Sequence, residues 1–140
     1  MRPAVALGPG ELRAAMLTFR DALRAHRQEL NDLNVYPVPD GDTGTNMALT
    51  LEAVAKELDA LDAERGSPVM ADVCRAMAHG SLMGARGNSG VILSQLLRGI
   101  AERIGAADQV GAGTLADALV VASDLAGKAV VRPVEGTILT

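Results

Sequence analysis

Aromatic side chains are almost missing from this sequence of 140 residues, which holds one Phe, one Tyr and no Trp. This scarcity disfavours aromatic-rich β-sandwiches and proteins that stack single-stranded nucleic acids on aromatic rings. Hydrophobic residues still make up 49% of the chain, which is enough for one folded domain. Leu, Val, Ile, Met and Ala must therefore supply the core, and this composition favours packed helices.

Cysteine, excess positive charge and long apolar runs are also scarce. Cys74 is the single cysteine, so no disulfide can form within the chain, and we expect it to pack in the interior of a protein from a reducing compartment. A net charge of −4 disfavours nucleic-acid binding. No apolar run is long enough for a membrane span, and the one at the N-terminus is too short for a secretory signal. We therefore expect a cytoplasmic protein.

Apolar residues recur at every third or fourth position along almost the whole chain, which is the spacing of amphipathic helices. One helix is predicted over about 11–30, with an apolar face of Leu12, Met16, Phe19, Leu23, His26 and Leu30. Further helices are predicted over about 43–61, 68–83, 88–104 and 114–131, and a sixth begins at Gly136 and Thr137. The pattern predicts an all-α antiparallel bundle with two unusual loops.

The first loop, residues 34–46, carries two closely spaced carboxylates. Asp40 and Asp42 flank one glycine, and a bound cation is the natural way to hold such charges together. A calcium loop is disfavoured, because Gly44 and Leu51 stand where it needs an oxygen ligand and a glutamate. Mg²⁺, which shares its shell with water and phosphate oxygens, fits better. The alternative is an Asp-Gly turn followed by a helix cap.

The second loop, residues 84–90, reads GARGNSG and runs into a helix. Glycines allow close approach of the backbone, and a helix N-terminus directs N–H groups at an anion. Arg86, Asn88 and Ser89 add further donors, so the loop has the outline of a phosphate site, although it is neither a Walker loop nor a dinucleotide fingerprint. The alternative is a flexible connection capped by Asn88 or Ser89. Together the two loops match the two halves of a Mg–nucleotide site.

Three segments resemble, in order, the signatures of a known family. Residues 34–47, NVYPVPDGDTGTNM, resemble the metal-binding signature of the dihydroxyacetone kinase L-subunit (DhaL) domain. Residues 83–95, MGARGNSGVILSQ, resemble its phosphate-binding signature, and residues 132–140 resemble a third family segment. The prolines before Asp40 make the N-terminal domain of bacterial fatty acid kinases the nearest branch.

The resemblance implies a barrel of antiparallel helices that binds ATP or ADP at one end with Mg²⁺, as two ions. The implied metal ligands are Asn34, Asp40 and Asp42. The residues implied to contact the nucleotide are Thr45, Asn46, Gly87, Asn88, Ser89, Gly136 and Thr137. No catalytic residue is implied, because positioning and charge neutralisation do most of the work in phosphoryl transfer.

The implied reaction is transfer of a phosphoryl group from ATP to a fatty acid, which an acyl-carrying fatty-acid-binding protein presents. One alternative is the dihydroxyacetone (glycerone) kinase L-subunit, whose partner subunit binds the ketone. Another is a helical interaction module without catalysis. The family domain extends about two helices beyond the third segment, so residues 1–140 are expected to be a DhaL-like ATP–Mg-binding kinase domain that is incomplete at its C-terminus and can complete itself as a homodimer.

Overall fold

Helices form nearly all of the regular structure of the chain. The computed structural model describes residues 6–35, 39–65, 68–130 and 137–139. Within these ranges there are six α-helices and no β-strand, which confirms the predicted all-α fold. The helices are α1 Pro9–Ala25, α2 Arg27–Asp32, α3 Thr43–Arg65, α4 Met70–Gly84, α5 Gly87–Gly105 and α6 Ala112–Lys128.

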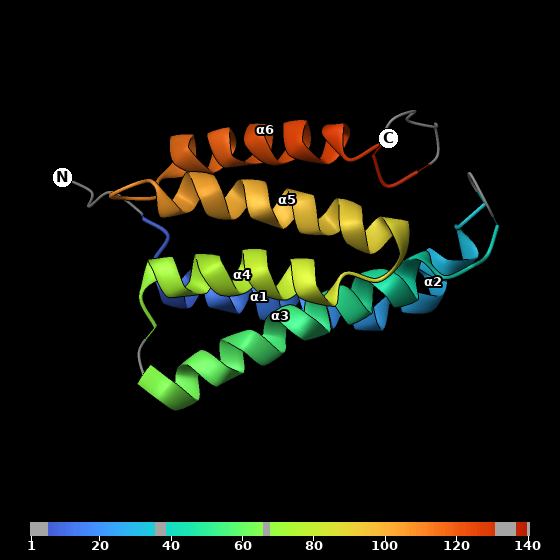
Figure 1. Ribbon diagram of the computed structural model, residues 1–140, viewed down its shortest axis with the longest axis horizontal. Helices are drawn as coiled ribbons and strands as arrows, with labels where there is room; N and C mark the ends of the chain where they lie inside the picture. Colours follow the sequence, from blue (N-terminus) through green and yellow to red (C-terminus); the bar gives the residue numbers. More distant parts are fainter. Residues whose placement is uncertain (1–5, 36–38, 66–67, 131–136, 140) are drawn as a thin grey trace.

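Among the long helices α1, α3, α4, α5 and α6, each runs opposite to the long helix before it in the chain (Figure 1). The helix α3 packs against α1 and α4, α4 packs against α5, and α5 packs against α6. Only Ala85 and Arg86 separate α4 from α5, and so short a connection folds the second helix back on the first. The first turns of α3 and α5 therefore lie at the same end of the bundle. We call it the loop end, because residues 39–42 and 85–86 lie there.

The core is aliphatic, as the composition predicts. Leu51, Val54 and Leu58 form the buried face of α3, and none of them is more than 1% exposed. They belong to one continuous cluster with Met77 of α4 and Ile104 of α5. Burying one such side chain contributes about 1.5–3 kcal/mol relative to leaving it in water, so this cluster is a main source of stability.

The first predicted helix is divided in two at His26, whose backbone (φ −106°, ψ 12°) separates α1 from α2. The prediction that His26 packs in the core was wrong. Its side chain is 60% exposed, and its Nδ1 atom lies 3.1 Å from a carboxylate oxygen of Glu29. The break directs α2 across the start of α3, where the Arg27 carbonyl leaves no room for a side chain at Gly44.

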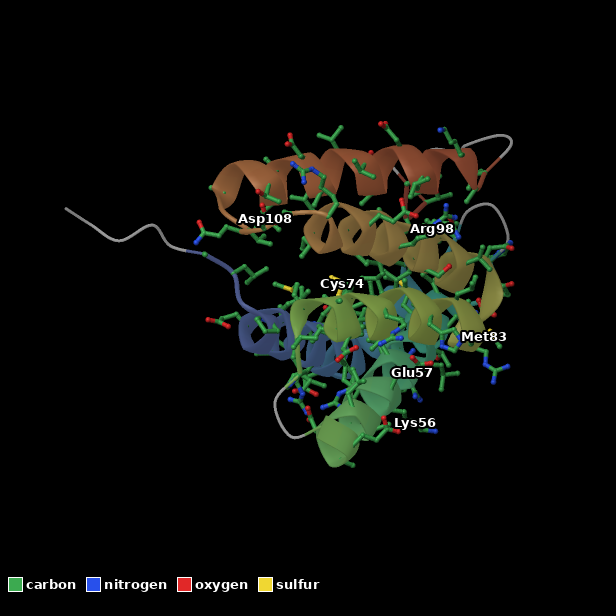
Figure 2. The ribbon with its side chains drawn as sticks, turned by 60° about the vertical axis from the view of Figure 1, so that its left-hand side comes forward. Lys56, Glu57, Cys74, Met83, Arg98 and Asp108 are labelled. Atoms are coloured by element: carbon green, nitrogen blue, oxygen red, sulfur yellow. The ribbon has the colours of Figure 1, made fainter. Side chains whose placement is uncertain are left out.

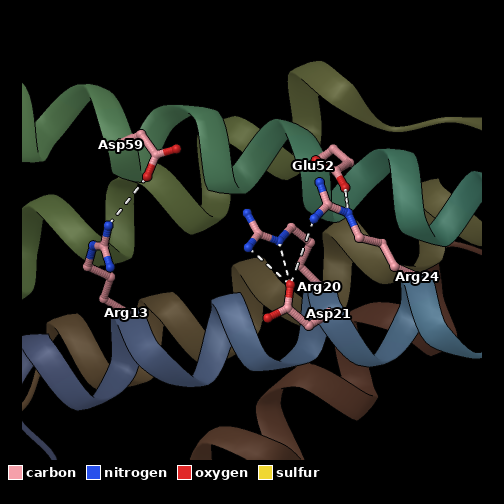
Figure 3. Close-up of polar contacts among 6 residues, drawn as sticks. All are labelled: Arg13, Arg20, Asp21, Arg24, Glu52 and Asp59. Atoms are coloured by element: carbon pink, nitrogen blue, oxygen red, sulfur yellow. Dashed lines mark hydrogen bonds and ion pairs between the residues drawn. The ribbon is translucent and has the colours of Figure 1, made fainter.

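Charged residues line the seam between α1 and α3 (Figure 3). Arg13 pairs with Asp59 and Asp62, and Arg24 pairs with Glu52. The hydrogen bond with Glu52 raises the pKa of the Arg24 guanidinium. Pairs in contact with water contribute little energy, so the seam decides which faces of the two helices meet more than it stabilises them.

The last helix, α6, lies at the edge of the bundle. Among the described helices it packs only on α5, through Ala118, Ala122 and Ala126, and it exposes Leu119 and Val120. No helix within the described ranges is long and apolar enough to cross a membrane. The predicted sixth helix falls partly outside the description, because Gly136 is not among the described residues and residues 137–139 form a turn. The incompleteness of the domain stays a prediction.

Candidate nucleotide and metal site

The structure brings the two predicted loops together at the loop end. The hydroxyl of Ser89, in the first turn of α5, lies 3.5 Å from the carbonyl oxygen of Thr43, the first residue of α3. Gly87 lies against the side-chain amide of Asn46, and a Cβ atom at Gly87 would collide with it. The side-by-side placement that the predicted site requires is therefore present, while the ligand role of each residue stays a prediction.

The acidic loop presents two carboxylates to solvent. Asp40 and Asp42 are both exposed, and the glycine between them adopts the left-handed backbone (φ 66°) that a tight turn needs. Within the described part of the chain, no group donates a hydrogen bond to either carboxylate. Their oxygens are therefore available to an external cation.

Asn34, which was predicted as a metal ligand, caps α3. Its Oδ1 atom accepts hydrogen bonds from the backbone N–H groups of Asp42, at 3.1 Å, and Thr43, at 3.2 Å. A metal bound through the same oxygen would compete with these bonds. The structure thus supports a capping role for Asn34, and metal ligation by it stays a prediction.

Asn31 is a site residue that sequence reasoning missed. Its Oδ1 atom accepts a hydrogen bond from the Thr45 N–H at 3.0 Å, and its Nδ2 atom donates to the Thr45 hydroxyl at 3.0 Å. The Thr45 hydroxyl accepts in this contact, so its own hydrogen can still be donated to another acceptor. The pair of bonds ties α2 to the first turn of α3 and fixes the side chain of Thr45.

The glycine-rich loop leaves the start of α5 open. The helix begins at Gly87, one or two residues before the predicted start, and no side chain caps it. The N–H groups of Gly87, Asn88 and Ser89 have no acceptor within the helix, whereas the next, that of Gly90, donates to the Arg86 carbonyl at 3.1 Å. Uncapped N–H groups at the positive end of a helix dipole suit the oxygens of a phosphate.

The third predicted segment is described only in part. Gly136 lies outside the described residues, and Thr137 is half-buried in the turn 137–139. The turn 137–139 lies at the loop end (Figure 1), on the same side of the bundle as the acidic loop.

The residues at the loop end suit Mg²⁺ better than metals that need more ligands from the protein. Among the described residues, no group of three or more His, Cys, Asp and Glu side chains could hold a metal ion. Two carboxylates are a sufficient protein contribution for Mg²⁺, which usually keeps several waters and binds phosphate oxygens. The pair Asp40 and Asp42 therefore fits a Mg–phosphate complex, in which the ligand completes the shell.

Cys74 does not belong to this site. Its side chain lies in the interior between α4 and α5 (Figure 2), which confirms the predicted packing role. Burial raises the pKa of its thiol, so little of the reactive thiolate forms at neutral pH. Met83, by contrast, lies at the end of α4 with 71% of its surface exposed.

Comparison with known proteins bears on the same residues. Residues 37–140 match the DAK2 domain, which is of the DhaL type and is related to kinases, so the resemblance to that family is confirmed. The matched range includes both loops of the candidate site apart from residues 34–36.

Three relatives illustrate the similarity. Protein YloV of Bacillus subtilis is 47% identical over 130 residues, which are 88% of this chain and 23% of that protein. An uncharacterized protein of Staphylococcus haemolyticus is 49% identical over 111 residues, which are 79% of this chain and 19% of the relative. An uncharacterized protein of Staphylococcus aureus strain USA300 is 47% identical over 111 residues, which are 79% of this chain and 20% of that relative. The chain spans about a fifth of the length of these curated relatives.

Proposed function

Because the chain belongs to the DAK2 domain family, we propose that it binds Mg–ATP at the loop end and transfers the γ-phosphoryl group to an acceptor held by a partner protein. The observation that carries the proposal is the meeting of the acidic loop and the start of α5, with the Ser89 hydroxyl 3.5 Å from the Thr43 carbonyl oxygen. An exposed carboxylate pair beside an uncapped helix N-terminus offers ligands to both parts of a Mg–triphosphate.

Each set of residues has a distinct role in this proposal. Asp40 and Asp42 hold the divalent ion, which when bound neutralises negative charge on the phosphates. The N–H groups of Gly87 and Asn88, with the Ser89 hydroxyl, hold phosphate oxygens.

Four further residues belong to the proposed site. Thr45 donates its hydroxyl hydrogen toward the nucleotide, and Asn46 lies between the two loops. Gly136, outside the described residues, and Thr137 are included because the family resemblance implies that they contact the nucleotide.

We favour a fatty acid as the acceptor, presented by an acyl-carrying fatty-acid-binding protein. The bond between the γ-phosphorus and the bridging oxygen of ATP breaks, a bond to an acceptor oxygen forms, and ADP leaves. A carboxylate is already deprotonated at neutral pH, so its phosphorylation needs no base, and the site as predicted includes none. Dihydroxyacetone, the alternative acceptor, presents a hydroxyl whose proton must be taken up, which its ketone-binding partner subunit would have to arrange.

The sharpest test of the metal site is the removal of each loop carboxylate. We expect Asp40→Asn and Asp42→Asn each to weaken Mg–ATP binding at least about tenfold, because one charged ligand of the ion is lost. Isothermal titration calorimetry at fixed Mg²⁺ measures the affinity. Asp124→Asn is the matched control, because Asp124 is also exposed but lies on α6. Wild-type affinity in both loop variants would exclude this metal site.

A second experiment identifies the acceptor and distinguishes a kinase from an interaction module. ADP formation is followed with Mg–ATP and either a fatty acid on its binding protein or dihydroxyacetone on its partner subunit. Turnover with only one of them identifies the acceptor. If Mg–ATP gives no thermal shift of the purified chain, catalysis by this chain is unsupported, and the alternative of a helical interaction module is favoured.

A further inference from the structure

Thr50 is a polar residue of α3 that lies in the interior beside the candidate site. It is 0% exposed, although a threonine hydroxyl is costly to bury without partners. The hydroxyl donates a hydrogen bond to the Asn46 carbonyl oxygen at 2.8 Å and accepts one from the Arg86 N–H at 3.3 Å. One hydroxyl therefore joins the first turns of α3 to the residue that precedes α5.

The start of α5 is built closely around this hydroxyl. A Cβ atom at Gly90 would lie 2.6 Å from the Thr50 Oγ1 atom, a distance that real Cβ atoms do not adopt. Glycine at position 90 thus lets the first turn of α5 approach α3 at the level of Thr50. A change that removes the hydroxyl also removes the hydrogen bond that joins the Arg86 N–H to α3.

Two other buried hydroxyls show that this arrangement is not a general feature of the helices. Ser81 donates to the Met77 carbonyl at 2.6 Å, and Ser94 donates to the Val91 carbonyl at 2.7 Å. Both bonds stay within one helix. Of the three buried hydroxyls in the described part of the chain, only that of Thr50 bonds across to a second segment.

We propose that Thr50 is a positioning residue of the candidate site, whose hydroxyl sets where the uncapped N–H groups of α5 lie relative to the acidic loop. The inference rests on the proposed function, because it concerns how the phosphate and metal subsites are kept in register. Thr50 does not touch the ligand, since it is fully buried. It acts through Arg86, which is followed directly by the N–H groups proposed to hold phosphate.

The test compares two substitutions at one position. Thr50→Val keeps the shape of the side chain and removes the hydroxyl, whereas Thr50→Ser keeps the hydroxyl. We expect Thr50→Val to weaken Mg–ATP binding about tenfold, and Thr50→Ser to stay within about twofold of the wild type. Calorimetry measures both affinities. Ser81→Ala, which removes a buried hydroxyl that bonds only within α4, is the control and should bind as the wild type does.

Hydrogen exchange of the Arg86 amide, measured without nucleotide, tests the positioning independently of binding. We expect this amide to exchange at least about tenfold faster in Thr50→Val and to be unchanged in Thr50→Ser and Ser81→Ala. Wild-type affinity in Thr50→Val, or an equal loss in Thr50→Ser, would overturn the inference. If the wild type bound no Mg–ATP, the proposed function would fail, and unchanged Arg86 exchange in Thr50→Val would in addition exclude Thr50 as the link between the two segments.

Discussion

Two helices begin side by side at the loop end, and their first turns differ in how the backbone N–H groups are satisfied. At α3, Asn34 accepts hydrogen bonds from Asp42 and Thr43, and Asn31 accepts one from Thr45. At α5, no side chain caps the helix and the first turn holds no acidic residue. Side-chain oxygens of the chain thus accept hydrogen bonds from the first turn of α3, which we call the closed helix end. No side chain caps α5, which we call the open helix end.

In the proposed site, this difference would suit a cation beside α3 and an anion at the start of α5. The positive end of the α3 dipole lies next to the acidic loop, where it offsets part of the charge on Asp42. Because two of its first three N–H groups, those of Thr43 and Thr45, are already bonded to asparagine side chains, α3 has less to offer a phosphate. The open end of α5 supplies what α3 lacks, namely N–H groups directed at an external acceptor.

The largest effect on stability and Mg–ATP affinity is expected at Gly87, where the open end of α5 meets the closed end of α3. Its backbone is left-handed (φ 65°), and a Cβ atom would collide with the Asn46 amide. We expect Gly87→Ala to lower the free energy of unfolding by about 2 kcal/mol. We also expect it to weaken Mg–ATP binding about a hundredfold, because the Asn46 side chain or the start of α5 must move within the proposed site. Chemical denaturation and calorimetry measure the two quantities.

Gly113→Ala is the matched control for this prediction. Gly113 also lies in the first turn of a helix, α6, but a Cβ atom there would meet nothing within 4 Å. Alanine is the better helix former, so this variant should be neutral or stabilised by up to about 1 kcal/mol, with unchanged affinity. Equal behaviour of the two variants would mean that the α3–α5 contact is not tight at Gly87.

A smaller effect is expected at the cap of α3. We expect Asn34→Ala to lower the free energy of unfolding by about 1 kcal/mol, because two N–H groups lose their acceptor. Asn34→Asp keeps an acceptor oxygen and should unfold as the wild type does, while the added carboxylate should bind Mg²⁺ at least as tightly. Thermal unfolding and Mg²⁺ titration distinguish the roles. A wild-type unfolding temperature in Asn34→Ala would show that the cap is unimportant.

The sequence predicts local features of this molecule well, because their signals are local. The apolar spacing of Leu51, Val54 and Leu58 predicts the buried face of α3, and glycines mark both loops of the site. The division of the first helix at His26 could not be predicted in this way. The hydrophobic spacing continues through the break, since Leu30 of α2 still packs against the core.

Contacts between residues that are far apart in the sequence could not be predicted from it. Thr50 and Arg86 are 36 residues apart, and nothing in the pattern around either residue indicates that they meet. Asn31 lies in a short helix with charged neighbours, where its pairing with Thr45 has no local signal. The two loops were predicted to share a site because their chemistry is complementary, whereas the residues that hold them together emerge only from the packing of α2, α3 and α5.

The smallest effect on stability is expected at Ser89, in the uncapped first turn of α5. Its hydroxyl lies 3.5 Å from the Thr43 carbonyl oxygen, at the outer limit of a hydrogen bond, so Ser89→Ala should change the free energy of unfolding by no more than about 0.5 kcal/mol. The same variant should bind Mg–ATP about fivefold more weakly, because a donor to phosphate is lost. Loss of stability with unchanged affinity would instead make Ser89 a structural residue like Asn34, and the contrast between the two helix ends would no longer hold.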